Sequence, residues 1–235
     1  MQIFADAVRE GMAVFTSGAV DVWTIIWVSL RTSGTAVFLA LLLGIPAGFA
    51  LGTRRFIGRR LLITIANTGM GLPPVVVGLV VAMTLSRRGP LGDLDLLYTR
   101  PAMVIAQVII ALPIVAAVTA AAVGAVPREV RLQARSLGAS RIHEALLTLA
   151  EARLGLVAAV AAGFGQVISE VGAVMMVGGN LEGSTRVMTT AIVQFTRMGR
   201  YGPALALSLV LLGLIFLVNV LLAVGQHSAE RFERS

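Results

Sequence analysis

Five long apolar runs constrain this chain more than any other feature of its sequence. A helix needs about 20 apolar residues to cross the ~30 Å hydrocarbon core of a bilayer, and each run reaches that length. Only 13% of the residues are charged, against roughly 25% in typical soluble domains. We therefore predict an all-α polytopic membrane protein with about five core transmembrane helices, at residues 32–53, 61–86, 101–126, 154–180 and 201–226.

The five runs define a single transmembrane domain over residues 32–226, with a polar tail at 227–235. Residues 1–31 are amphipathic, and we expect them to lie on or enter the membrane surface. Trp23 and Trp27 would share a helix face there, and tryptophan gathers at membrane–water interfaces. The chain start lacks the basic region and cleavage site of a signal peptide.

Arginine supplies all nineteen basic residues, and the net charge is +7. The arginines stand in the gaps between apolar runs, which is typical of membrane-protein loops and not of a nucleic-acid surface. Four of them lie in RRFIGRR, residues 54–60, so the positive-inside rule puts this loop in the cytoplasm. Five spans then place residues 127–153 and the C-terminus on the same side, with the N-terminus outside.

Glycine and proline interrupt the first two runs. Glycines recur every four residues at Gly44, Gly48 and Gly52, a face that permits close helix approach. Pro46 predicts a kink in the same helix.

The second run contains NTGMGLPPVVVG, whose glycines and prolines, among them Pro73 and Pro74, disfavour a continuous helix. Broken backbone at membrane depth is tolerated where protein covers it or where it lines a wet cavity. A simple proline kink is an equally weighted alternative.

Residues 127–153 form a polar, basic stretch between the third and fourth runs. Pro127 suits a helix start, Gly138 suits the left-handed position after a helix end, and Ser140 can cap a second helix. The first helix would carry an apolar ridge and a basic stripe, formed by Val130, Ala134 and Leu137 and by Arg128, Arg131 and Arg135. This pattern indicates a docking element, although the stripe could instead bind anionic lipid headgroups.

The same stretch resembles the signature loop of permease subunits of ATP-binding-cassette importers. That signature reads Glu-Ala-Ala, three residues, Gly, nine residues, then Ile-x-Leu-Pro. With Gly138 on the signature glycine, Ala134 also matches. The remaining signature positions carry Leu132, Gln133, Thr148, Ala150 and Glu151.

Further stretches are similar to permeases for the oxyanions molybdate, tungstate and sulfate. These are residues 72–92, 169–180 and 179–192, of which the last looks most like the tungstate branch.

The resemblance implies a type I importer permease fold with a cytoplasmic coupling helix. It also implies a second copy of the chain, two cytoplasmic ATPase subunits and an extracytoplasmic solute-binding protein, assembled in the lipid bilayer of a bacterial or archaeal cytoplasmic membrane. The chain has no lysine and no G-x-x-x-x-G-K-[ST] loop, so ATP and magnesium would bind to the partner subunit. We expect no cofactor, no nucleic-acid partner and no enzymatic activity in this chain.

The resemblance implies that the chain forms the pathway for an oxyanion, most like tungstate or molybdate. Sulfate, an amino acid and a secondary-transport mechanism remain alternatives. A membrane enzyme is disfavoured because no nucleophile, metal or acid–base cluster is visible. The chain has no cysteine, and His143 and His227 lie far apart, so we expect neither a catalytic nor a metal site. A structural subunit without transport stays open.

Three groups of residues are the site predictions. Coupling to the ATPase is assigned to Arg131, Ala134, Arg135, Ser136, Leu137, Gly138, Ala139 and Ser140. The pathway or gate is assigned to Asn67, Thr68, Pro73, Pro74, Ser169 and Glu170. Docking of the binding protein is assigned to Arg186, Arg197 and Arg200, with solvated loop charge as the alternative.

Within the pathway group, Glu170 is the only charge deep in the fourth run. Intramembrane carboxylates are functional candidates, but a carboxylate is a poor ligand for a divalent anion. We therefore expect Glu170 to hydrogen-bond a neighbouring helix or to shape a gate, whereas neutral hydroxyl and amide groups let an oxyanion pass.

Overall fold

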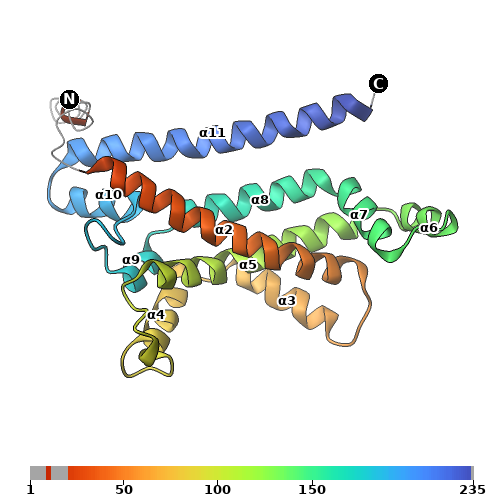
Figure 1. Ribbon diagram of the computed structural model, residues 1–235, viewed down its shortest axis with the longest axis horizontal. Helices are drawn as coiled ribbons and strands as arrows, with labels where there is room; N and C mark the ends of the chain where they lie inside the picture. The colour runs from red at the N-terminus through yellow and green to blue at the C-terminus, as the bar shows by residue number, and fades with distance from the viewer. Residues whose placement is uncertain (1–8, 12–20, 234–235) are drawn as a thin grey trace.

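The computed structural model describes residues 9–11 and 21–233, with side chains described as far as Val224. All regular elements among these residues are helical, as the apolar runs predict (Figure 1). The helices are α2 (Val22–Thr53), α3 (Arg59–Met70), α4 (Pro74–Leu85), a 3₁₀ turn η1 (Gly92–Leu94), α5 (Arg100–Gly124), α6 (Arg128–Ser136), α7 (Arg141–Glu151), α8 (Arg153–Ile168), α9 (Gly172–Gly178), α10 (Met188–Arg197) and α11 (Tyr201–Glu233).

Three of these helices, α2, α5 and α11, are long and apolar enough to cross a membrane by themselves. Two further pairs pass the same test together, although α3–α4 is bent by 102° and α7–α8 by 71°. The described part of the chain therefore holds up to five spans if each bent pair counts as one. The loop after α2, the α6–α7 hairpin and the C-terminal end of α11 all lie at one end of the molecule, on the right in Figure 1.

The first and last elements differ from the predicted boundaries. Helix α2 is continuous from Val22, so residues 22–31 belong to the first long helix. Its start is capped by Asp21, whose Oδ1 accepts a hydrogen bond from the Thr24 N–H at 3.0 Å and whose pKa is lowered by the bonds to Thr24. Helix α11 runs to Glu233 and absorbs most of the predicted tail. Residues 1–8, 12–20 and 234–235 lie outside the described residues.

Helix α5 is the centre of the fold and packs along α2 on one side and α8 on another. The glycine face of α2 makes the first contact possible. A methyl group at Gly48 would lie 2.5 Å from the Ala116 carbonyl oxygen, and one at Gly44 would lie 2.7 Å from the Val115 side chain. The small-residue face thus serves helix packing within the chain. Pro46 lies inside α2 without ending it.

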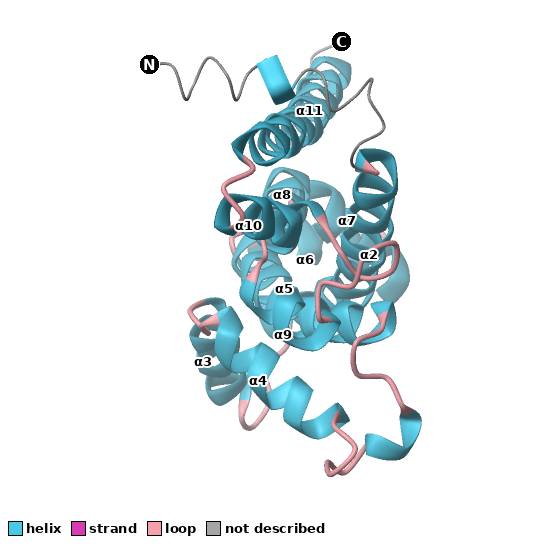
Figure 2. Cartoon of the chain, turned by 90° about the vertical axis from the view of Figure 1, so that its left-hand side faces the viewer, coloured by secondary structure: helices cyan, strands magenta, loops and turns pink. Residues whose placement is uncertain are grey.

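The second span is broken, not merely kinked. Helix α3 ends at Met70 and α4 begins at Pro74, so the backbone leaves the helical path between them. A proline at the first position of a helix is favourable because its missing N–H would have no helical partner. Beyond the break α4 packs against α9, where a methyl group at Gly78 would lie 2.6 Å from the Ala173 Cα. Figure 2 shows α3 and α4 set away from α11, which lies at the opposite edge.

The fourth predicted run also breaks, because α8 ends at Ile168 and the short helix α9 follows from Gly172. Glu170 is buried in this break, only 6% exposed, and its Oε1 accepts the Ala173 N–H at 2.9 Å. Thr189 donates to the Glu170 carbonyl oxygen at 2.7 Å, and the Gln107 side chain donates to the Val167 carbonyl oxygen at 3.2 Å. Side chains from α5 and α10 therefore replace hydrogen bonds that the helix loses at the break.

Replacing Gly48 with alanine tests the close contact between α2 and α5. The new methyl group must push against Ala116 backbone, and overpacking of this kind costs about 1–3 kcal/mol. We expect a lower melting temperature of the purified protein in detergent. Gly34→Ala in the same helix is the matched control, because nothing lies within 4 Å of its added methyl group. Equal destabilisation by both substitutions would contradict the packing account.

Glu170→Leu and Glu170→Gln separate hydrogen bonding from charge at the α8–α9 break. Glutamine keeps an oxygen that can accept the Ala173 N–H, whereas leucine leaves this buried donor unpaired, which costs about 1–3 kcal/mol. We expect Glu170→Leu to lower the melting temperature and Glu170→Gln to stay near the wild-type value. A stable leucine variant would show that the bond contributes nothing to the fold.

Candidate functional site

Helix α7 lies level with the ends of α2 and α11, and α6 projects beyond them (Figure 1). The hairpin is anchored by Val130 and Leu149, which pack in one cluster with Val123 of α5. Helix α6 starts directly after Pro127 and ends at Ser136. Gly138 follows with φ of +82°, a left-handed conformation that glycine adopts without steric cost. Ser140 then caps α7, accepting the His143 N–H at 3.3 Å. The helix–glycine–helix pattern predicted from the sequence is confirmed.

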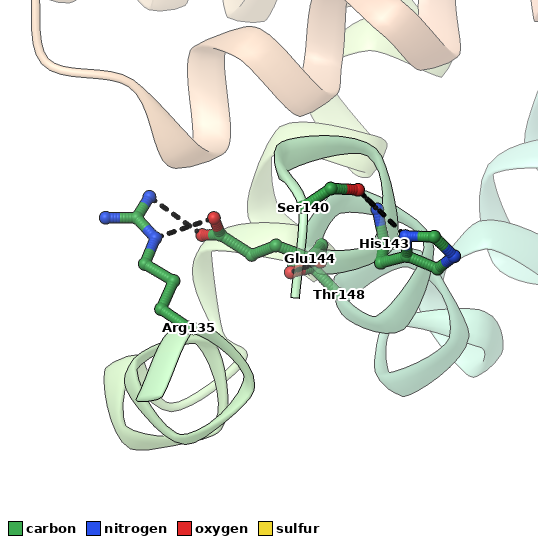
Figure 3. Close-up of polar contacts among 5 residues, drawn as sticks. All are labelled: Arg135, Ser140, His143, Glu144 and Thr148. Carbon is green, nitrogen blue, oxygen red and sulfur yellow. Dashed lines mark hydrogen bonds and ion pairs between the residues drawn. The ribbon is translucent and has the colours of Figure 1, made fainter. Parts of the chain in front are cut away.

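An ion pair fixes the two helices of the hairpin to each other (Figure 3). Arg135 Nε lies 2.7 Å from Glu144 Oε2, and Arg135 Nη2 lies 3.0 Å from Glu144 Oε1. The hydrogen bonds and charge of Glu144 raise the pKa of Arg135 above its usual value. A two-point contact between a guanidinium and a carboxylate sets orientation as well as distance. The pair therefore orients α6 relative to α7, although it adds little stability because the Arg135 side chain is 63% exposed.

The predicted apolar ridge of α6 is wrong at one end. Ala134 is buried, but Leu137 follows the last helical residue and is 88% exposed. The reason is local, since the turn into Gly138 swings the chain away from the helix face. Leu137 therefore points into open space. On α7, Ile142 and Leu146 are exposed as well.

The other coupling candidates divide between the two sides of α6. Ser136 is exposed, and its Oγ donates to the Gln133 carbonyl oxygen at 2.8 Å. Ala139 is half-buried, with its N–H donating to the Ala134 carbonyl oxygen at 3.0 Å. Arg131 is half-buried and faces a cavity between α6, α7 and the end of α2. The eight coupling candidates thus form one hairpin with an exposed tip and an inner wall.

The two backbone breaks meet, which brings several pathway candidates together. A methyl group at Gly172 would lie 2.7 Å from the Val75 side chain, so the first turns of α9 and α4 are in contact. Pro73 and Pro74 lie on one side of this contact, and Ser169 and Glu170 lie just before α9. Ser169 is exposed, and its Oγ donates to the Gly165 carbonyl oxygen at 2.6 Å.

Two predicted pathway residues lie elsewhere. Asn67 lines a cavity of 220 Å³ among α2, α3 and α5. Thr68 lines a larger, mostly apolar groove of 890 Å³ among the same helices. The structure therefore does not unite the six pathway candidates around one cavity. Gln107 was not predicted, because its partner Val167 is 60 residues away in the sequence.

The three arginines predicted to contact a binding protein differ in solvent exposure and in pairing. Arg186 forms an ion pair with Glu182, with Nη1 3.3 Å from Oε1, and its side chain is only 11% exposed. Arg197 and Arg200 are exposed. The Arg200 guanidinium lies 5.2 Å from the centre of the Phe195 ring. Arg186 thus stabilises its own loop, which leaves Arg197 and Arg200 as the accessible pair.

A further arginine in this region, Arg100, makes a contact that the sequence did not predict. Arg100 Nε donates to the Ser184 carbonyl oxygen at 2.9 Å, and the Tyr98 N–H donates to the Val177 carbonyl oxygen at 2.8 Å. These bonds join the start of α5 and the residues just before it to α9 and to the loop after α9, across 84 and 79 residues of the chain. No sequence motif predicts these hydrogen bonds. Within the described residues, no group of three histidine, aspartate or glutamate side chains could hold a metal ion.

Comparison with known proteins identifies the family of this chain. Residues 44–227 match the family described as "Binding-protein-dependent transport system inner membrane component". The chain is 45% identical over 199 residues to a "Probable anion ABC transporter permease protein" of Haloferax volcanii, covering 83% of this chain and 86% of that protein. It is 40% identical over 222 residues to the "Tungstate uptake system permease protein TupB" of Peptoclostridium acidaminophilum, covering 94% and 97%.

More distant matches support the same fold. The chain is 27% identical over 178 residues to the "Molybdenum transport system permease protein ModB" of Escherichia coli K12, covering 72% of this chain and 78% of that protein. A chain of the MetNI methionine ABC transporter, in an inward-facing structure, superposes with a TM-score of 0.67 at 18% identity, covering 90% of this chain and 95% of that chain. The chain therefore belongs to the family of inner membrane components of binding-protein-dependent transport systems, as a membrane-embedded permease subunit and not an enzyme.

Proposed function

We propose that this chain forms the transmembrane pathway of an ATP-driven importer for tungstate or molybdate. The similarity to a tungstate permease over 94% of the chain is the observation that carries this proposal. A sulfate permease, CysW of Synechococcus elongatus, is only 25% identical, so sulfate is the second candidate. The system would operate in a bacterial or archaeal cytoplasmic membrane.

The pathway would lie between two copies of the chain. The break between α3 and α4 leaves Gly71, Leu72 and Pro73 exposed in a single chain. Non-helical backbone at membrane depth must be covered by protein or line a water-filled space. A second copy placed against this break would satisfy that requirement. It would also cover the exposed apolar stripe of α4, formed by Val75, Val76, Leu79, Val80 and Met83.

Energy would come from two ATPase subunits docked on the α6–α7 hairpins, which would bind the ATP and magnesium. The ion pair between α6 and α7 and the exposed tip at Leu137 support this proposal. Closure of the ATPases would move the hairpins as rigid bodies and switch the access of the pathway. On the opposite side, Arg197 and Arg200 would meet acidic groups of a solute-binding protein.

Leu137→Ala tests the docking of the ATPase subunit. Leu137 is 88% exposed, so its removal should leave the isolated chain as stable as before. If the partner buries this side chain, its loss weakens the complex by about 10- to 100-fold, measured as the Kd of the ATPase subunit for the reconstituted permease. Ile57→Ala is the control, since Ile57 is fully exposed in the loop after α2. Unchanged affinity for Leu137→Ala would exclude the hairpin tip as the docking point.

Calorimetry on the cognate solute-binding protein tests the substrate. We expect tungstate or molybdate to bind at least about tenfold more tightly than sulfate, a difference of about 1.4 kcal/mol. Uptake of the same anions into liposomes that hold the assembled transporter should follow the same order. Preferred binding of sulfate or of an amino acid would overturn the proposed substrate while leaving the permease family untouched.

A further inference from the structure

A basic cavity lies behind the coupling hairpin, on the side opposite its exposed tip. It consists of two adjoining hollows of 280 and 300 Å³ between the C-terminal end of α2, α6 and α7. Both hollows are walled by Thr53, Arg131, Arg135 and Glu144. We call this combined space the inner basic cavity.

The wall of the inner basic cavity carries a large excess of positive charge. Six arginines line it: Arg54, Arg55, Arg128, Arg131, Arg135 and Arg141. Glu144 is the single carboxylate in the wall, and it is already paired with Arg135. Arginine does not lose its proton in proteins, so titration cannot relieve the remaining repulsion. Arg131 is half-buried, whereas the other five are exposed, where solvent weakens the repulsion. An anion in the cavity would relieve it.

A hydrogen-bond donor in this wall also lacks an acceptor. Arg131 Nε is shielded from solvent and has no hydrogen-bond partner among the described residues. Buried donors in proteins nearly always have partners, and the exceptions call for an explanation. The neighbouring cavity offers the place for an acceptor from outside the chain. Guanidinium groups favour phosphate oxygens in particular, because their planar N–H pairs match two oxygens at once.

The position of the cavity indicates where such a phosphate comes from. Thr53 is the last residue of α2, one of the long apolar helices, and Arg54 and Arg55 follow it directly. The end of a spanning helix and its first polar residues lie at the level of the lipid headgroups. Basic pockets beside helix ends on the cytoplasmic side suit anionic headgroups.

We propose that the inner basic cavity binds the phosphate group of an anionic phospholipid from the cytoplasmic leaflet. The phosphate would join the end of α2 to α6 and α7 and so brace the hairpin from its inner side. The ATPase subunit would meet the exposed tip at Leu137, so the two contacts use different sides of the hairpin. The inference rests on the membrane location of the family and does not depend on which solute is carried.

Native mass spectrometry of the full chain in detergent tests the proposal. The probes are dioleoyl phosphatidylglycerol and dioleoyl phosphatidylcholine, which share their acyl chains and differ in net charge. We expect tighter binding of phosphatidylglycerol. Each arginine near an anionic headgroup contributes about fivefold in affinity, so the double variant Arg54→Gln/Arg131→Gln should bind phosphatidylglycerol about 25-fold more weakly.

Two matched variants separate this site from general charge and from misfolding. Arg60→Gln/Arg87→Gln removes the same charge from two exposed arginines that do not line the cavity, and it should leave the affinity within about twofold of wild type. Arg54→Lys/Arg131→Lys keeps the charge and should retain most of the binding. Equal losses in the cavity variant and the surface variant would overturn the proposal, as would wild-type affinity in Arg54→Gln/Arg131→Gln.

Two further experiments identify the source of the anion. Millimolar inorganic phosphate should fail to release bound phosphatidylglycerol; full release would show that the cavity holds a free ion and would overturn the lipid assignment. Addition of the ATPase subunit should leave the bound lipid in place. Stoichiometric release would show that carboxylates of the partner fill the cavity, and this result would also overturn the proposal.

Discussion

Backbone N–H and C=O groups at membrane depth must find partners inside the protein, and the rest of this structure follows from that constraint. Continuous helices satisfy it by themselves, as in α2 and α5. The two breaks cannot, and the helical turns that follow them, at the starts of α4 and α9, are in contact. Glu170, Thr189 and Gln107 supply the missing hydrogen bonds at the α8–α9 break.

Helix α5 links the α8–α9 break in the centre of the molecule to the end that carries the α6–α7 hairpin. The helix begins at Arg100, which bonds to the Ser184 carbonyl oxygen, passes Gln107 at the break, and continues along the glycine face of α2. It ends just before the α6–α7 hairpin. Glycines bring the α2 backbone against α5, so this contact is closely packed along its length.

The α6–α7 hairpin combines an internal ion pair with an exposed tip. Arg135 and Glu144 join α6 to α7, while the left-handed Gly138 leaves Leu137 outside the packed region. The inner side of the hairpin carries charge that the chain does not neutralise. The two sides of one short helix thus suit two different partners, a protein on the outside and an anion on the inside.

The sequence by itself determined the class of the fold, the approximate number of spans and the helix–glycine–helix hairpin. These follow from run length, charge placement and turn chemistry, which are local properties. It also located the helix-disrupting glycine and proline residues around Pro73 and Pro74. It could not distinguish a kinked helix from a broken one, since that depends on what covers the backbone groups that lose their helical hydrogen bonds.

Only the tertiary structure decided how the predicted site residues are used. Arg186 is engaged by Glu182, Asn67 and Thr68 line different cavities from the α4–α9 contact, and Leu137 leaves the helix face on which its spacing placed it. The six arginines of the inner basic cavity come from two regions more than 70 residues apart. Helical periodicity places residues on a face of their own helix, but only packing decides which distant groups meet that face.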